Sequence, residues 1–99
     1  MTIFEKIAAR EIPAQIVHET DDFMAVQDVN PQAPVHVLIV PKRVIPRIAE
    51  GQAGDAELLG RMLLASSEIA KKVGVAEGGY RLVINNGRDA GESVPHLHI

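Results

Sequence analysis

The stretch that decides the fold is Glu92-Ser93-Val94-Pro95-His96-Leu97-His98-Ile99, at the end of the 99-residue chain. Apolar and polar residues alternate here with a period of two, which is typical of a β-strand. Because a strand sends residues i and i+2 to the same face, we expect the imidazoles of His96 and His98 to point the same way. Two such groups can act as nucleophile, acid or base near neutral pH. A structural alternative stays open, in which each imidazole only donates a hydrogen bond to a neighbouring carbonyl.

The first half of the chain predicts three more strands. β-prone residues run from Gln15 to Glu19 and from Phe23 to Asp28, and the turn-forming residues between them predict a hairpin. After the rigid, proline-containing connection Asn30–Pro34, the nearly all-apolar segment Val35–Val40 predicts a strand buried on both faces. His36 interrupts that segment, so we expect it in the interior or in a pocket wall.

Two helices and a further strand complete the pattern. Apolar residues at helical spacing predict a short helix over residues 3–8, and a long helix is predicted to begin after Asp55 and to end before Gly74. Tyr80–Asn85 predicts another strand, which a glycine-containing loop joins to the terminal histidines. Strands that cluster before and after one long helix, instead of alternating with helices, predict an α+β fold with an antiparallel sheet.

Composition limits the classes of protein to which the chain can belong. With 99 residues, 46% of them hydrophobic, it is long enough for one domain spanning residues 1–99. The formal net charge of -3 argues against nucleic-acid binding, and the lack of cysteine excludes disulfides and thiolate metal sites. The chain begins with no basic segment followed by an apolar run, and it contains no stretch of 18 apolar residues. We therefore expect a cytoplasmic protein with no membrane or nucleic-acid partner.

The terminal segment and its loop gather groups that suit a phosphate. Asn85, Ser93, His96 and His98 would lie in one hairpin-like unit, where amide and hydroxyl donors can hold phosphoryl oxygens and a neutral imidazole can attack phosphorus. His36 could join them from the central strand. A zinc site would need more than two histidines on a strand with no cysteine or fixed carboxylate beside them, so we expect no metal.

Several separate motifs, in the same order, resemble the histidine triad (HIT) superfamily, and specifically its Hint branch of nucleotide-binding phosphoramidases. The matching stretches cover residues 2–4, 10–14, 28–36, 40–42, 79–85 and 91–98. The resemblance implies a HIT-like fold with a five-stranded antiparallel sheet, one long helix and one short helix. It also implies a two-fold homodimer, a purine nucleotide ligand and no cofactor.

The same resemblance implies a role for each matching residue. His98 corresponds to the nucleophile that forms a nucleotidyl-imidazole intermediate, and the main-chain carbonyl of His96 accepts from its Nδ1. His36 supports the triad, Ser93 and Asn85 contact the phosphate, and Asp28 holds the ribose hydroxyls. The resemblance also implies an apolar pocket for the base, lined by Ile3, Phe4, Ile7, Val26, Val29 and Leu38.

The resemblance also fails at one position. The third histidine of the triad would be residue 100, so we expect a domain that lacks its C-terminal end and has weak general-acid assistance to the leaving group. Two functions remain open. The chain is either a hydrolase of purine nucleoside 5′-phosphoramidates, with dinucleoside polyphosphates as the nearby substrate variant, or a nucleotide-binding or interaction module with little turnover.

Overall fold

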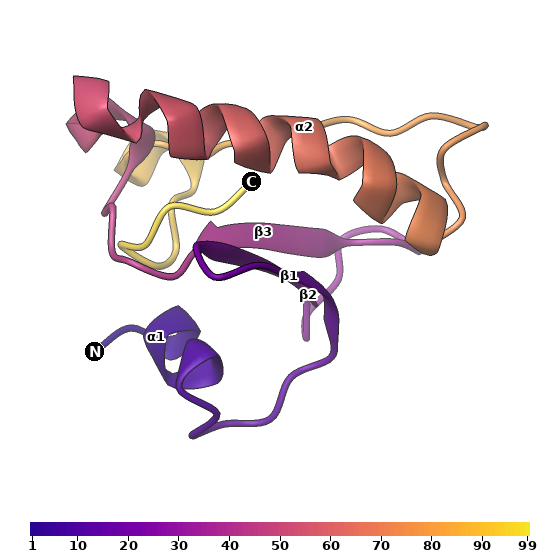
Figure 1. The fold of residues 1–99 in the computed structure, drawn as a ribbon, viewed down its shortest axis with the longest axis horizontal. Coiled ribbons are helices and arrows are strands. Elements are labelled where there is room, and N and C mark those ends of the chain that lie inside the picture. The colour runs from indigo at the N-terminus through magenta and orange to yellow at the C-terminus, as the bar shows by residue number, and fades with distance from the viewer.

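The computed structural model describes all residues, 1–99, and arranges them in three layers. A three-stranded antiparallel sheet, in the order β1-β2-β3, lies between the short helix α1 (Ile3–Ala8) and the long helix α2 (Ala56–Lys72) (Figure 1). The chain also has three single 3₁₀ turns, η1 (Ile48–Glu50), η2 (Ala53–Asp55) and η3 (Arg88–Ala90). The predicted α+β class and both predicted helices are confirmed.

The predicted hairpin is formed by β1 (Ile16–Glu19) and β2 (Phe23–Gln27). Its turn is held by Thr20, whose hydroxyl oxygen accepts from the backbone N–H groups of Asp22, at 3.2 Å, and Phe23, at 3.1 Å. A short polar side chain at this position substitutes for a backbone acceptor, which is why the sequence signal for the turn was strong.

The predicted central strand is present as β3 (Val37–Pro41), which pairs with β2 along its whole length. It starts two residues later than the sequence indicated, because Val35 is exposed and the imidazole of His36 accepts from the backbone N–H of Gln32. Its last three residues, from Ile39 to Pro41, are the buried part. Burial on both faces was therefore predicted correctly only for the second half of the segment.

Helix α2 begins and ends where the sequence predicts, but its N-terminal cap bonds differently. Gly74, with a φ of 80°, lets Val75 donate to Ala70 and closes the helix in a left-handed turn. Asp55 lies at the predicted N-terminal cap, but its carboxylate does not bond to the helix amides. It accepts instead from the backbone N–H of Gln52 and pairs with Arg43, and these two partners hold its pKa below the usual value.

The expectation of five strands is wrong for this chain, whose sheet has three. Residues 80 to 86 take part in no backbone hydrogen bond to another backbone group, so the predicted strand Tyr80–Asn85 is not formed. The backbone of the terminal histidine segment is bonded to that of β3 only where Ile39 and Ile99 exchange both hydrogen bonds, at 2.9 and 3.0 Å. Neither segment forms a strand, because strand-forming residues also need a neighbouring strand to pair with.

The two faces of the sheet bury two separate apolar clusters. On the α2 side, the cluster includes Phe23, Ile39, Leu58 and Met62, and on the α1 side it includes Phe4, Ile7, Met24, Val26 and Val40.

Neither helix has the length and apolar character that a membrane-spanning helix requires.

Candidate active site

The segment from His96 to Ile99 runs beside the free edge of β3 and divides its side chains between the two faces of the sheet. Leu97 and Ile99 belong to the cluster beneath α2. The rings of His96 and His98 both pack against Phe4 of α1. The centroid of each imidazole lies 5.4 Å from the centroid of the Phe4 ring. The predicted alternation, with both imidazoles on one face, is therefore confirmed.

The imidazole of His98 is held in one tautomer. Its Nδ1 lies 2.9 Å from the carbonyl oxygen of His96, and a carbonyl can only accept, so Nδ1 carries the proton. In the neutral form of the ring Nε2 then has a free lone pair, and this atom makes no hydrogen bond within the chain. The side chain is only partly buried. A neutral imidazole with an unprotonated, accessible nitrogen is the form that a nucleophilic histidine needs.

His96 is fully buried and is bonded at both ring nitrogens. Its Nε2 donates to the carbonyl of Pro41 at 2.7 Å, and its Nδ1 lies 2.7 Å from the hydroxyl of Thr2. Burial lowers the pKa of His96, although the Pro41 carbonyl and the charge of Glu5 act in the opposite direction. The ring is therefore neutral near pH 7. The His96 carbonyl is the group that reaches His98.

The structure does not bring His36 next to His98. Because Ile39 is paired with Ile99, His98 lies across from Val40. His36 precedes Val40 by four residues, just outside β3, which separates the two backbone positions by roughly 13 Å at about 3.3 Å per residue. The ring of His36 instead faces Asp28, with 3.5 Å between His36 Nε2 and Asp28 Oδ2. The two residues form a second polar group on the sheet, and their predicted roles stay predictions.

Ser93 and Asn85 have side chains that make no hydrogen bond, and Ser93 is exposed. The loop between them is fixed by Glu92, which accepts from Arg47 Nε at 3.0 Å, from Arg47 Nη2 at 3.1 Å and from the backbone N–H of Gly87 at 3.0 Å. These contacts hold the pKa of Glu92 below its usual value. Sequence reasoning missed this pair because an arginine and a glutamate 45 positions apart carry no local signal.

The residues predicted to line a base pocket separate into two groups. Phe4, Ile7 and Val26 are buried in the cluster beneath α1, and Leu38 packs against it. The two that remain exposed at the surface are Ile3 and Val29. The first group is therefore part of the core, whatever else it contacts.

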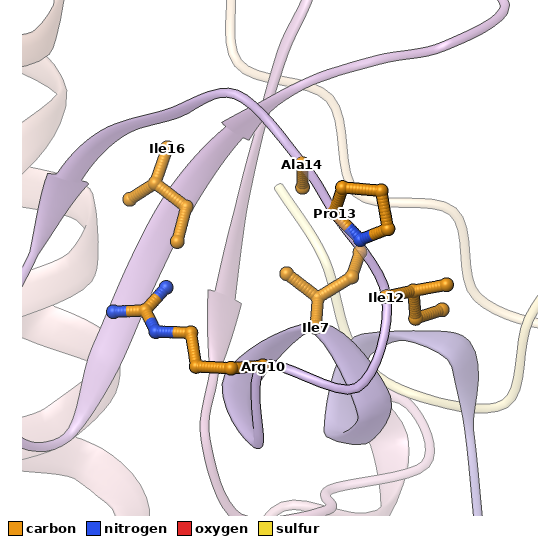
Figure 2. Close-up of a pocket in the computed structure, with 6 residues that line it drawn as sticks. All are labelled: Ile7, Arg10, Ile12, Pro13, Ala14 and Ile16. Atoms are coloured by element: carbon orange, nitrogen blue, oxygen red, sulfur yellow. The ribbon is translucent and has the colours of Figure 1, made fainter.

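A hollow of about 180 Å³ lies between α1 and β1 and is lined by Ile7, Arg10, Ile12, Pro13, Ala14 and Ile16 (Figure 2). Of the residues predicted for the base, only Ile7 borders it. Ligand pockets usually have volumes of roughly 300 to 1,000 Å³, so this hollow is smaller than a nucleotide site. No group of three or more His, Asp or Glu side chains lies close enough together to hold a metal ion.

Comparison with known proteins gives one consistent result. The model of the HIT domain family matches residues 9–99. Purine nucleoside phosphoramidase of Escherichia coli is 45% identical over 98 residues, which cover 99% of this chain and 82% of that protein. An uncharacterized HIT-like protein of Synechocystis is 51% identical over 99% of this chain and 85% of its own length. A crystal structure of a HIT family hydrolase from Legionella pneumophila superposes with a TM-score of 0.94 at 42% identity, covering 99% of this chain and 88% of that one.

Proposed function

The chain belongs to the HIT domain family, and on that basis we propose that it is a hydrolase that cleaves purine nucleoside 5′-phosphoramidates at the P–N bond. The HIT-like fold that the sequence predicted is confirmed by the superposition on solved HIT structures. The observation that carries the proposal is the 2.9 Å contact between His98 Nδ1 and the His96 carbonyl, which leaves Nε2 free to attack phosphorus. The 45% identity to the E. coli phosphoramidase supports the substrate class.

The proposed reaction has two steps, both at His98. In the first, Nε2 forms a bond to phosphorus in line with the leaving nitrogen, the P–N bond breaks, and its electron pair leaves with the amine, which takes up a proton from solvent. In the second, water attacks the phosphorus of the nucleotidyl-imidazole and gives up a proton to solvent, and the P–N bond electrons return to Nε2, which releases the nucleoside monophosphate and restores the neutral ring. The hydrogen bond from Nδ1 to the His96 carbonyl strengthens when the ring carries charge, so it stabilises both transition states.

The direct test is to incubate the chain with adenosine 5′-phosphoramidate and to measure the release of AMP. A diadenosine polyphosphate in a parallel reaction separates the two substrate classes, because it presents a P–O bond to the same nucleophile. Reversible binding of AMP with no release of product from either compound would contradict the hydrolase and support the nucleotide-binding module.

For the nucleotide itself, we predict that Asp28 binds the ribose hydroxyls. One carboxylate oxygen already accepts from the backbone N–H of Asn30 at 2.8 Å, which fixes the group beside His36. Hydrogen bonds to a charged acceptor contribute about 1.5 to 3 kcal/mol, so Asp28→Asn should weaken AMP binding about ten- to a hundredfold. Calorimetry with AMP and its 2′,3′-dideoxy analogue checks this prediction, since the variant should lose the preference for AMP.

The matched control for Asp28 is Asp22→Asn, which removes an exposed carboxylate that pairs with Arg61. This control should bind both nucleotides as the native chain does. Equal affinity of the native chain for AMP and the dideoxy analogue would remove the ribose role from Asp28.

We further predict that the chain forms a homodimer through the unpaired segment after α2. Tyr80, Leu82 and Val83 are exposed there, and the backbone of residues 80 to 86 has no backbone partner. An exposed apolar segment with unpaired backbone groups favours association with a second copy. Light scattering at micromolar concentration should give twice the chain mass of 10.7 kDa.

Val83→Asp should convert this dimer to a monomer, because it places a charge in the apolar segment. Val29→Asp changes an exposed valine on the connection between β2 and β3 and should leave the mass unchanged. A native chain that scatters as a monomer, or a Val83→Asp variant that stays dimeric, would rule out this interface.

A further inference from the structure

A series of hydrogen bonds through His96 links the N-terminus of α1 to the candidate nucleophile, which lies near the other end of the sequence. The hydroxyl of Thr2 contacts Nδ1 of His96, Nε2 of His96 contacts the Pro41 carbonyl, and the His96 carbonyl contacts Nδ1 of His98. All three distances lie between 2.7 and 2.9 Å. Thr2 and His96 are 94 positions apart, so local structure alone does not impose the contact.

The direction of each hydrogen bond follows from the acceptors. The Pro41 carbonyl has no proton, so His96 Nε2 carries one, and Nδ1 of the neutral ring must accept. The Thr2 hydroxyl therefore donates its proton to His96 Nδ1. The same oxygen accepts from the backbone N–H of Glu5 at 3.1 Å, where Thr2 is the N-terminal cap of α1. The Thr2 hydroxyl thus donates a hydrogen bond to His96 and accepts one from the backbone of α1.

Bonding at both ring nitrogens fixes the orientation of His96. The ring is fully buried, and it packs against Phe4 at an interplanar angle of 84°. A side chain held on both sides also restrains its own backbone, and the carbonyl of that backbone is what holds the tautomer of His98. Loss of the Thr2 donor would leave Nδ1 of His96 buried without a partner, which favours a shift of the ring.

We propose that Thr2 is a positioning residue for His98, which acts by donating to His96 Nδ1 and so keeping the His96 carbonyl on Nδ1 of the nucleophile. It does not touch the reacting atoms itself. This role rests on the proposed hydrolase function for its effect on rate, but not for its effect on the two imidazole tautomers. Helix α1 thereby helps to position the active site through Thr2, the residue that caps its N-terminus.

Three substitutions separate positioning from helix capping. Thr2→Ser keeps both the donor and the cap, Thr2→Val removes both, and Thr2→Asp keeps the cap but can only accept. We expect Thr2→Ser to match the native chain. We expect kcat to fall about tenfold in Thr2→Val and Thr2→Asp, which is the rate equivalent of one lost hydrogen bond, with KM unchanged. A capping role alone would leave Thr2→Asp fully active.

Nitrogen-15 NMR of the histidine rings gives a readout that does not depend on activity. In the native chain, His96 should carry its proton on Nε2 and His98 on Nδ1. In Thr2→Val and Thr2→Asp, neither of which donates to His96 Nδ1, the His98 signals should show a mixture of tautomers. Thr2→Asp keeps the test valid if Thr2→Val does not fold.

The results that would overturn the role of Thr2 differ from those that would refute the proposed hydrolase function. Unchanged His96 and His98 signals in both variants, or an unchanged kcat in an active protein, would overturn the role of Thr2. A native chain that shows the expected tautomers but hydrolyses no phosphoramidate would refute the proposed function, and the NMR of the variants would still decide whether Thr2 holds the two rings.

Discussion

His98→Ala is expected to lower kcat for a purine nucleoside phosphoramidate by on the order of 10⁴-fold or more, while the affinity for AMP changes only a few fold. The attacking nitrogen is Nε2, and its loss removes the first chemical step. Few contacts in the ground state depend on it, because His98 is only partly buried and its Nε2 bonds to nothing within the chain. Steady-state kinetics and equilibrium binding of AMP measure the two quantities separately.

The matched control is His18→Ala, which removes an imidazole from the other face of the sheet. His18 stacks on Phe23, with ring centroids 5.9 Å apart, and its Nδ1 lies 2.9 Å from Lys72 of α2. The control should keep its activity. Mass spectrometry of the native chain with substrate should show a nucleotidyl group on His98, and this adduct should be absent from His98→Ala. Comparable rates for the two variants would exclude His98 as the nucleophile.

Local patterns predicted those parts of the molecule that local physics determines. The period of two placed His96 and His98 on one face, since a strand-like backbone requires it whether or not a full ladder forms. The turn at Thr20 and the end of α2 at Gly74 were predictable because each depends on one side chain or one φ value. These features need no knowledge of the partner segments.

What the sequence could not show depends on which segments meet. Tyr80–Asn85 has strand-forming residues, but a strand requires a paired neighbour, and none lies beside it. The offset between His36 and His98 follows from the register at Ile39, which no residue pattern encodes. Thr2 had a local signal, the Thr2-x-x-Glu5 capping box, but its contact with His96 arises only when α1 packs under the sheet.

Phe4 is where packing and the proposed site coincide, so Phe4→Ala should have the largest effect on stability among the residues discussed. The ring is buried, with 5% of its surface exposed, and contacts both imidazoles at 5.4 Å. Truncation of a buried phenylalanine leaves a cavity and costs about 3 to 5 kcal/mol in the free energy of unfolding. Urea denaturation followed by circular dichroism measures the change.

Ile3→Ala is the matched control, because Ile3 precedes Phe4 on the same helix and has 46% of its surface exposed. We expect it to change the free energy of unfolding by less than about 1 kcal/mol. If Phe4→Ala cost no more than Ile3→Ala, the cluster beneath α1 could not be the core that the structure describes. The pair therefore tests packing without reference to any ligand.

The same measurement with AMP decides whether Phe4 also contacts the base. A ligand at a hundred times its Kd stabilises the native state by about 2.7 kcal/mol, provided that it does not bind the unfolded chain. If Phe4 is core alone, Phe4→Ala should keep this increment at the AMP concentration that saturates the native chain. If Phe4 lines the base pocket, as the family resemblance implies, the increment should shrink along with the affinity. The two measurements separate the two roles of Phe4. A packing role changes the free energy of unfolding without AMP, whereas a base contact changes only the increase in that free energy when AMP is added.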